Sequence, residues 1–418
     1  MSKNFLRIHP IDNILAALQD MKKDFVVEFE GKSFPLRNNV SAKHKFALQE
    51  FKVGDPILMY GALIGKATKP IAQGESITID NVVHASADYN VGEQQSHWVA
   101  PDISKWKNST FNGYHRADGS VGTANHWLVI PMVFCENRNV NVLRSTLLSA
   151  LGYETAKDYI IDTEVLVSQY KKGASAEEMM ASPLIKTAED IKQNRTFPNV
   201  DGIKFLTHDG GCGCDRGDSD TLCNLLAGYI TNPNVAGATI LSLGCQNAEV
   251  KILEAAIAKR DPNFSKPLHI LEQQKSKSER HFIEEAVKKT FLGLIEANKV
   301  TRQPSPLSKL VLGLECGGSD GFSGISANPA LGYASDLIVA LGGATVLSEF
   351  PELNGVEQEL INRCEAPENA EKFASIMRAY SAKAVSIGSG FENNPSPGNI
   401  KDGLITDAMK SAGAAKKG

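Results

Sequence analysis

Three glycine-rich segments carry side chains that can bind metals or move protons, and each follows an apolar run with the pattern of a strand. The first, residues 207–216, holds His208, Asp209, Cys212 and Cys214. Its small residues let a ligand approach the backbone, while the imidazole, carboxylate and thiols supply metal ligands or acid–base groups. The alternative is a glycine-rich turn with a buried cysteine and a capping aspartate. The crowding of four reactive side chains favours the functional interpretation.

The second segment, LGCQN at 243–247, repeats this pattern with Cys245. A single cysteine at a strand end is often only a small buried residue. In open α/β sheets, however, ligand sites form beyond the carboxyl ends of the strands. A functional role for Cys245 is favoured because Cys245, like Cys212, follows a strand candidate.

The third segment, LECGGSDGFSG at 314–324, is the most informative. A strand candidate ends, Gly317 and Gly318 turn the chain, and Ser319 and Asp320 stand where a helix can begin. Backbone N–H groups at such a position can hold a carboxylate. Serine and aspartate are also favoured N-caps, so a purely structural turn stays open. The small polar residues that follow, with Asn328 among them, are more than such a turn requires.

Weaker candidates lie in three other loops and in the first 88 residues. Glu349, Glu352 and Glu357 can act as bases or metal ligands, or can be ordinary surface acids. The remaining candidates are residues 111–125, residues 394–399, His9, His44 and Lys45. The sequence has no Walker A loop, His-Glu-x-x-His motif, CxxC pair or Gly-x-Ser-x-Gly motif, and its Gly-Cys-Gly lacks the spacing of a dinucleotide fingerprint.

The amino-acid composition restricts the kinds of ligand and partner that the protein can bind. The 418 residues carry 44 basic and 48 acidic side chains, a net charge of −4. This balance argues against a nucleic-acid partner, because no basic excess is available to neutralise phosphates. An anionic substrate would need locally placed lysines, arginines, helix N-termini or a metal.

The seven cysteines are an odd number in a long chain and do not indicate a disulfide framework. The N-terminus lacks an apolar signal core, and no stretch approaches about 18 apolar residues. We therefore expect a cytoplasmic protein with reduced thiols and no membrane partner. Whether the chain forms a homo-oligomer stays open.

The elements expected to position these residues fall into an α/β pattern. Residues 1–88 are expected to form a small β-rich domain with one helix, capped by Asp12 or Asn13 and carrying the apolar residues Ile14, Leu15, Leu18 and Met21. A hairpin is expected to turn near Glu30 and Gly31. Residues 89–108 have the character of a linker.

From residue 109 onward, apolar runs alternate with amphipathic stretches. The expected strands are 128–133, 204–207, 238–243, 310–314 and 344–347, and the clearest helix is 279–298, opened by a capping box of Ser276 and Glu279. This alternation predicts α/β layers with partly parallel sheets over 109–300 and 301–418. The final residues, SAGAAKKG, are expected to lack a stabilising element and indicate a chain truncated at its C-terminus.

Taken together, the segments resemble the altronate/galactarate dehydratase family, which includes sulfolactate sulfo-lyase. The resemblance covers the whole chain and is most specific in CGGSDGFSGISANPALGYASD at 316–336, LSEFPELNGVEQEL at 347–360 and NPSPGNIKDGLIT at 394–406. The start, with IHPIDN, VSAKHKFAL and YGALIGKAT, is similar to the SAF-type β-clip domain of these enzymes. Fusion of this domain to the remainder favours a sugar-acid dehydratase over the sulfo-lyase.

The chain also departs from the family pattern. Where many members have His-x-His-Asn, this chain has residues 78–81, TIDN, so a role of those histidines does not carry over. A frequent Gly-x-Arg-Asn is GTAN at 122–125, which loses a carboxylate-binding arginine. Family members also continue past the position that matches Gly418.

The resemblance implies β-elimination of water from D-altronate to give 2-dehydro-3-deoxy-D-gluconate, with dependence on Fe²⁺ or Mn²⁺. Our hypothesis is that His208 helps to bind the metal together with thiols from Cys212, Cys245 and Cys316. The segment with Gly317, Gly318, Ser319, Asp320 and Asn328 would hold the substrate. His44 or Lys45, from the small domain, would be the base or acid.

Three alternatives stay open. The substrate can be galactarate. Cys212, Cys245 and Cys316 can hold an iron–sulfur cluster with one open iron. The chain can also be a non-catalytic module that binds sugar acids.

Overall fold

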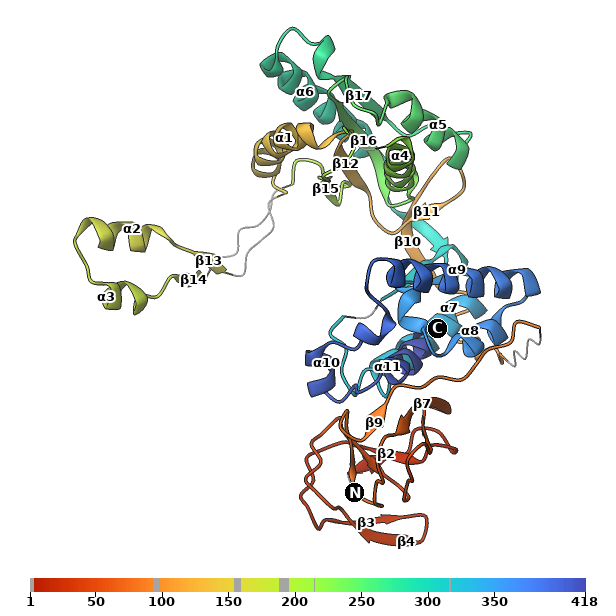
Figure 1. Ribbon diagram of the computed structural model, residues 1–418. Helices are drawn as coiled ribbons and strands as arrows, with labels where there is room; N and C mark the ends of the chain where they lie inside the picture. Colours follow the sequence, from red (N-terminus) through yellow and green to blue (C-terminus); the bar gives the residue numbers. More distant parts are fainter. Residues whose placement is uncertain (1–3, 93–97, 154–158, 188–194, 214, 316) are drawn as a thin grey trace. The chain divides into compact units, whose positions relative to one another are not determined.

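The computed structural model describes residues 4–92, 98–153, 159–187, 195–213, 215–315 and 317–418 (Figure 1). The chain forms two compact units. Unit 1 combines Met1–Ser109 with Leu307–Gly418, and unit 2 consists of Thr110–Pro306. The first and last segments of the chain therefore pack together, and the middle segment folds by itself.

The N-terminal part of unit 1 is built from short antiparallel strands. One sheet has the order β1-β2-β5-β8, a second has the order β6-β7-β9, and β3 pairs with β4. Their bounds are β1 Phe5–Leu6, β2 Ile14–Ala17, β3 Val26–Phe29, β4 Lys32–Pro35, β5 Lys45–Ala47, β6 Pro56–Met59, β7 Ala62–Ala67, β8 Ser76–Ile77 and β9 Val82–Val83. This is the small β domain expected from the sequence.

The helix expected after Asp12 is wrong, because residues Ile14–Ala17 form strand β2. The whole strand is buried, since it lies between two hydrophobic cores. Ile14 and Ala16 belong to one core, and Leu15 and Ala17 belong to the other. Alternate side chains of a strand point to opposite faces, so a strand buried on both faces reads as a continuous apolar run.

The expected hairpin is confirmed in β3 and β4. The turn residues Glu30 and Gly31 have φ of 49° and 75°. Two successive positive φ angles match the two-residue turn whose twist suits a hairpin. Glycine is required at the second position because it adopts this conformation without steric cost.

The C-terminal part of unit 1 begins with a β-α-β element, in which β19 and β20 are parallel. The bounds are η3 Leu307–Lys309, β19 Val311–Leu314, α7 Ala327–Ala340, β20 Ala344–Leu347, η4 Phe350–Leu353, α8 Glu357–Arg363, α9 Pro367–Ser386, η5 Phe391–Asn393, α10 Pro397–Lys401, α11 Asp407–Ala414 and η6 Ala415–Lys417. The expectation that the final residues lack a stabilising element is wrong. Helix α11 contributes Ala408, Met409 and Ala412 to a buried core that also contains Met59 and Ile64 of the β domain.

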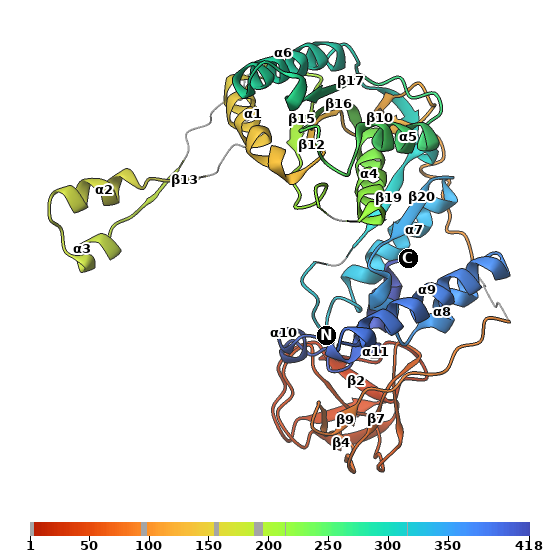
Figure 2. The ribbon, with the colours of Figure 1, turned by 45° about the horizontal axis from the view of Figure 1, so that its top comes forward.

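Unit 2 is a four-stranded parallel sheet in the order β15-β12-β16-β17, with helices on both faces (Figure 2). Helices α1 and α6 pack on one face, and α4 and α5 pack on the other. The bounds are β12 His126–Pro131, η1 Phe134–Glu136, α1 Asn137–Ala150, β15 Gly202–Phe205, α4 Arg216–Thr231, β16 Val235–Ser242, α5 Val250–Arg260, β17 Leu268–Glu272, η2 Gln273–Lys275 and α6 Glu279–Ala297. The parallel α/β layer is as expected.

Two smaller sheets complete unit 2. Strands β10 Thr110–His115, β11 Val121–Gly122 and β18 Gln303–Pro306 form an antiparallel sheet. Strands β13 Tyr159–Ile161 and β14 Ile185–Thr187 pair with each other, and the short helices α2 Glu164–Lys171 and α3 Ala176–Met180 lie between them in the sequence. Within the described residues, no helix is long and apolar enough to cross a membrane.

Helix α6 confirms the strongest helix expectation, although its cap differs. The N-cap is Ser278, whose side chain accepts a hydrogen bond from the backbone N–H of His281. Ser276 therefore does not form the expected capping box. The helix also carries Gly293 on its buried face, where it contacts the fully buried Trp127.

We expect Gly293→Ala to destabilise unit 2, although the same change usually stabilises a helix by about 1 kcal/mol. A Cβ at this position would lie 2.0 Å from the Trp127 ring, so the core must move. Overpacking of this kind costs about 1–3 kcal/mol, which urea unfolding would measure. The control is Gly228→Ala in α4, where the nearest atom would be 3.6 Å away. Equal or higher stability of Gly293→Ala would contradict this packing.

Candidate active site

The segment singled out from the sequence, 317–328, lies in unit 1 against a small cavity. The cavity leaves room for about one water molecule. It is lined by Tyr60, Ser319, Asp320, Ser323, Gly324, Asn328, Glu352, Leu404, Lys410, Gly413 and Ala414. Tyr60 comes from the β domain, while the others come from the loop before α7, the first turn of α7, and η4, α11 and their flanks. The cavity thus exists only because the two ends of the chain pack together.

Asp320 fixes the turn of the loop and lines one side of the cavity. Its Oδ1 accepts hydrogen bonds from the backbone N–H groups of Phe322 at 2.8 Å and Ser323 at 3.0 Å. Its Oδ2 lies 2.8 Å from Nζ of Lys43. Burial by itself raises the pKa of Asp320, but the contacts with Lys43 and Phe322 outweigh it and lower the pKa. Asp320 therefore stabilises a turn, as the structural alternative expected, and stays ionised.

The neighbouring glycines and Asn328 have different roles. A Cβ at Gly317 or Gly318 would meet nothing within 4 Å, so crowding inside the chain does not require glycine there. Asn328 donates from Nδ2 to the carbonyl oxygen of Gly413 at 2.9 Å, which ties α7 to α11. Ser319 accepts at its carbonyl oxygen from Nδ2 of Asn399 at 2.9 Å. The loop is thus fastened on both sides of the cavity.

Lys45 is an ionisable group in the core next to this loop. Its side chain is 1% exposed, and Nζ donates to the carbonyl oxygen of Gly403 at 2.7 Å. Burial lowers its pKa from 10.5 to about 7, and the negative charge of Asp320 only partly opposes this. The adjacent His44 has Nδ1 3.2 Å from the carbonyl oxygen of Ala42, and neither His44 nor Lys45 lines the cavity. Of the two proposed bases, Lys45 is the one whose pKa the charge of Asp320 raises.

Tyr60 was missed by the sequence analysis. Its side chain is 5% exposed, and within the described structure its hydroxyl has no hydrogen-bond partner. Burial raises the pKa of this phenol, and the nearby Asp12 and Asp320 raise it further. A Cβ at Gly324 would lie 2.5 Å from the hydroxyl, so glycine is needed there. No motif in the sequence singled out Tyr60; in the structure its φ of 60° is uncommon for a bulky residue.

A second charged group borders the cavity on the side of α11. Lys410 pairs with Glu352 at 2.9 Å and donates to Oδ1 of Asn394 at 3.0 Å. One turn earlier, Asp407 accepts hydrogen bonds from the side-chain amides of Asn354 and Asn394. Burial raises the pKa of Asp407 to about 7. Two buried groups near this cavity therefore have pKa values close to neutrality. The pKa of Lys45 is lowered to about 7, and the pKa of Asp407 is raised to about 7.

The other predicted residues lie in unit 2. His208 uses both ring nitrogens locally: Nε2 is 2.8 Å from the carbonyl oxygen of Pro131, and Nδ1 accepts from the N–H of Gly210 at 3.2 Å. This arrangement leaves neither nitrogen of His208 open to a metal. Cys212 and Cys245 follow strands β15 and β16, as expected. Cys316 lies outside the described residues.

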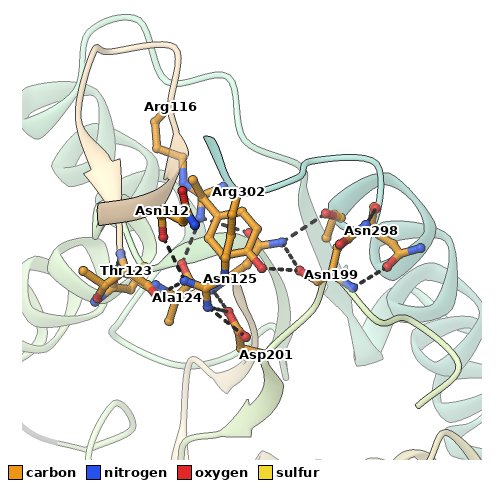
Figure 3. Close-up of polar contacts among 12 residues, drawn as sticks. Asn112, Arg116, Thr123, Ala124, Asn125, Asn199, Asp201, Asn298 and Arg302 are labelled. Atoms are coloured by element: carbon orange, nitrogen blue, oxygen red, sulfur yellow. Dashed lines mark hydrogen bonds and ion pairs between the residues drawn. The ribbon is translucent and has the colours of Figure 1, made fainter. Parts of the chain in front are cut away.

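The segment 111–125 has a structural role at the opposite, amino edge of the same sheet (Figure 3). The Nδ2 of Asn125 donates to the carbonyl oxygens of Asn199 at 2.8 Å and Ala297 at 3.1 Å. Arg302 forms a two-pronged ion pair with Asp201 at 3.1 and 3.0 Å. These contacts join β10, β12, β15 and the end of α6, so this segment is fully engaged in closing unit 2.

Three family models match successive regions of the chain. Residues 3–85 match the Altronate/galactarate dehydratase SAF domain, residues 113–298 match the D-galactarate dehydratase/Altronate hydrolase second domain, and residues 307–418 match the D-galactarate/Altronate dehydratase C-terminal domain. The chain belongs to the altronate/galactarate dehydratase family. The three matched regions correspond to the β domain, unit 2 and the C-terminal part of unit 1.

Three relatives from this dehydratase family each align over 99% of the chain. An altronate dehydratase of Bacillus subtilis is 31% identical and is covered over 73% of its length, and one of Escherichia coli is 28% identical with the same coverage. A galactarate dehydratase (L-threo-forming) of Escherichia coli is 27% identical and is covered over 72% of its length.

The residues at the cavity do not fit a single iron(II) ion. Across the described parts of the chain, no three His, Cys, Asp or Glu side chains surround a position for one metal ion. The two cavity carboxylates are instead paired with lysines, Asp320 with Lys43 and Glu352 with Lys410. An iron(II) ion would need carboxylate or imidazole groups as its own ligands. No reaction step is therefore assigned to a metal ion in this cavity.

The lowered pKa of Lys45 predicts that stability rises with pH. Between pH 7 and 10.5 the unfolded chain binds a proton that folded Lys45 has lost, so raising the pH favours folding by about 1.4 kcal/mol per pH unit in this window. Lys45→Met should remove this rise from urea unfolding at pH 7.5 and 9.5. The control, Lys52→Met at an exposed site of the same domain, should keep it. Parallel pH profiles for wild type and Lys45→Met would show that Lys45 is charged when folded.

Proposed function

We propose that this protein is a sugar-acid dehydratase that removes water from D-altronate to give 2-dehydro-3-deoxy-D-gluconate. The observation that carries the proposal is the cavity beside the Asp320 loop, lined by Tyr60 and Lys410, with the buried Lys45 within electrostatic range of Asp320. Membership of the dehydratase family and the identity to altronate dehydratases support the substrate class. The proposed setting is the cytoplasm, where free thiols stay reduced.

The cavity offers the groups that an aldonate needs. Lys410 supplies a positive charge at its wall for the substrate carboxylate, and Tyr60 supplies a hydroxyl without a partner in the described structure. Asn328 and Ser319 add polar groups from the loop. Among the described residues the buried hydroxyl of Tyr60 has no hydrogen-bond partner, which favours a ligand that supplies one, such as a polyhydroxylated acid, over an apolar ligand.

The reaction requires a base near neutrality. The C2 proton of an aldonate lies next to a carboxylate and is only weakly acidic. Lys45 is the proposed base, because its amine is neutral above pH about 7. A neutral amine can keep its hydrogen bond to Gly403 and still offer its lone pair.

The bond changes balance without an external reagent. The C2–H bond breaks, its electron pair forms the C2=C3 double bond, and the C3–O bond breaks to release hydroxide, which leaves as water after taking up a proton. The enol product then tautomerises to the 2-keto acid. Tyr60, held neutral by burial, is the proposed hydrogen-bond donor to a substrate hydroxyl, and the ammonium of Lys410 stabilises the negative charge that develops near the carboxylate.

The proposal is tested by anaerobic incubation with altronate, galactarate and other sugar acids, with iron(II) and reductant supplied, while 2-keto-3-deoxy products are measured. We expect turnover of altronate with kcat/KM that falls below pH about 7, because protonated Lys45 cannot accept the C2 proton. Preferential turnover of galactarate would reassign the substrate. Binding without turnover would indicate a non-catalytic module.

Two substitutions test the proposed roles. Lys45→Met should abolish turnover, and Tyr60→Phe should reduce kcat/KM by about 10- to 100-fold, the value of one lost hydrogen bond in a buried site. The matched controls are Lys52→Met and Tyr333→Phe, both at exposed positions of unit 1, which should retain activity. Normal activity in folded Lys45→Met would remove Lys45 from the mechanism.

A further inference from the structure

A second pocket of unit 1 lies beside helices α8 and α9. Its volume is about 770 Å³, within the range of about 300–1,000 Å³ that is typical of small-molecule sites. Its walls come from residues 86–89, residues 354 and 357, helix α9 and Phe391. The pocket therefore has room for a whole sugar acid, whereas the cavity beside Asp320 has to open before one can enter.

The frame of this pocket is held by contacts within unit 1. The N–H of Asn90 donates to Oε1 of Gln358 at 2.7 Å, and Nε2 of Gln358 donates to the carbonyl oxygen of Asn90 at 3.2 Å. An added Cβ at Gly355 would lie 3.2 Å from the Cβ of Ser86, so this segment packs against the turn before α8. Helices α8 and α9 share a small buried core. The pocket is thus built into the fold.

Glu357, a candidate base or metal ligand in the sequence, lies in this pocket. It is 7% exposed, and its Oε2 accepts a hydrogen bond from the N–H of Gly355 at 2.9 Å. Burial raises the pKa of Glu357, and among the described residues no cationic side chain opposes this. A carboxylate buried without a cation is costly unless hydrogen-bond donors surround it. A ligand that carries several donors, such as hydroxyl groups, is therefore favoured here.

Asn354 and Arg378 add an acceptor and a positive charge. Asn354 donates from Nδ2 to Oδ2 of Asp407 at 2.6 Å, so its amide oxygen is the atom that it can offer to a ligand. Arg378 pairs with Glu371, and the two side chains are 51% and 58% exposed. An exposed pair adds little stability, so a ligand carboxylate can compete for the guanidinium. Asp88 also lines the pocket but is exposed, so solvent screens its repulsion of an anion.

We propose that this pocket is a second binding site, for a small polyhydroxylated carboxylate. Arg378 pairs with the carboxylate, while Glu357 and the amide oxygen of Asn354 accept hydrogen bonds from the hydroxyl groups. Met377 and Phe391 contact the carbon chain. The site itself follows from the pocket, and only the identification of its ligand as altronate rests on the proposed function.

The pocket and the candidate cavity share a wall. Asn354 of the pocket lies two residues after Glu352, which lines the cavity. Asp407 accepts hydrogen bonds from both Asn354 and Asn394, and Asn394 in turn accepts one from Lys410 at 3.0 Å. A ligand bound at Asn354 is thus joined by hydrogen bonds to the lysine proposed to hold the substrate carboxylate. The pocket holds the acid before it enters the cavity, so variants of the pocket should raise KM more than they lower kcat.

The first test locates the ligand. Ser381→Cys places a thiol on the pocket wall in α9, and Ser375→Cys places one at an exposed position of the same helix outside the pocket. We expect altronate to slow alkylation of the first thiol in proportion to the occupied fraction of sites and to leave the second unchanged. Mass spectrometry of the labelled peptides measures both rates in the full chain.

The second test separates the carboxylate from the hydroxyl groups by calorimetric titration. Arg378→Met should weaken altronate binding by about 10- to 100-fold, the effect of losing a hydrogen bond between charged groups. It should leave the weaker binding of altritol, the neutral polyol of the same length, unchanged. Glu357→Gln should weaken the binding of both ligands. The matched control is Glu371→Gln, which removes the partner of Arg378 and should keep or tighten altronate binding.

Equal labelling of Ser381→Cys with and without altronate would overturn the proposal. Unchanged altronate affinity in folded Arg378→Met, or protection of Ser381→Cys by magnesium ions alone, would do the same. Protection in a protein that dehydrates no sugar acid would remove the proposed function and leave this site standing. Turnover of altronate without protection of Ser381→Cys would remove the site and leave the function.

Discussion

The packing of helix α11 against the β domain is the interaction on which the candidate site depends. Ala408 and Ala412 of the helix share a buried core with Met59 and Ile64 of the strands. Small residues let the helix approach closely, and Gly324 leaves room for the hydroxyl of Tyr60. Without this contact, Lys45 and Tyr60 would lie on one folded piece and Lys410 on another.

The same packing explains the electrostatics of the site. Lys45 and Asp407 have opposite charges when ionised, yet both titrate near pH 7, because burial disfavours the charged form of each. Each keeps a hydrogen-bond partner, Gly403 for Lys45 and two asparagine amides for Asp407. Burying such groups costs stability, and perturbed groups of this kind concentrate at functional sites.

In unit 2, the residues that stabilise the fold and the loops that carry reactive thiols lie at opposite edges of the parallel sheet. At the amino edge, Asn125, Asp201 and Arg302 satisfy backbone and side-chain groups within the unit. At the carboxyl edge, the loops carry Cys135, Cys212 and Cys245 in positions that the core does not use. Parallel strands bring their carboxyl ends to one edge, so loops distant in sequence can share a ligand only there.

The sequence by itself determined the local elements and the family. The β3–β4 hairpin followed from its turn glycine, and helix α6 and the parallel strands followed from hydrophobic periodicity. The loops with Asp320, Cys212 and Cys245 were recognised from their reactive residues. Such features depend on neighbours in the chain, which is why one sequence suffices to find them.

Only the tertiary structure decided the rest, because it depends on contacts between distant segments. Strand β2 looked like a helix until its two buried faces were known. The shifted pKa of Lys45 comes from burial under residues more than 350 positions away. Tyr60 carried no motif and became a candidate only through the cavity. Periodicity reports which face of an element is buried, but not what covers it.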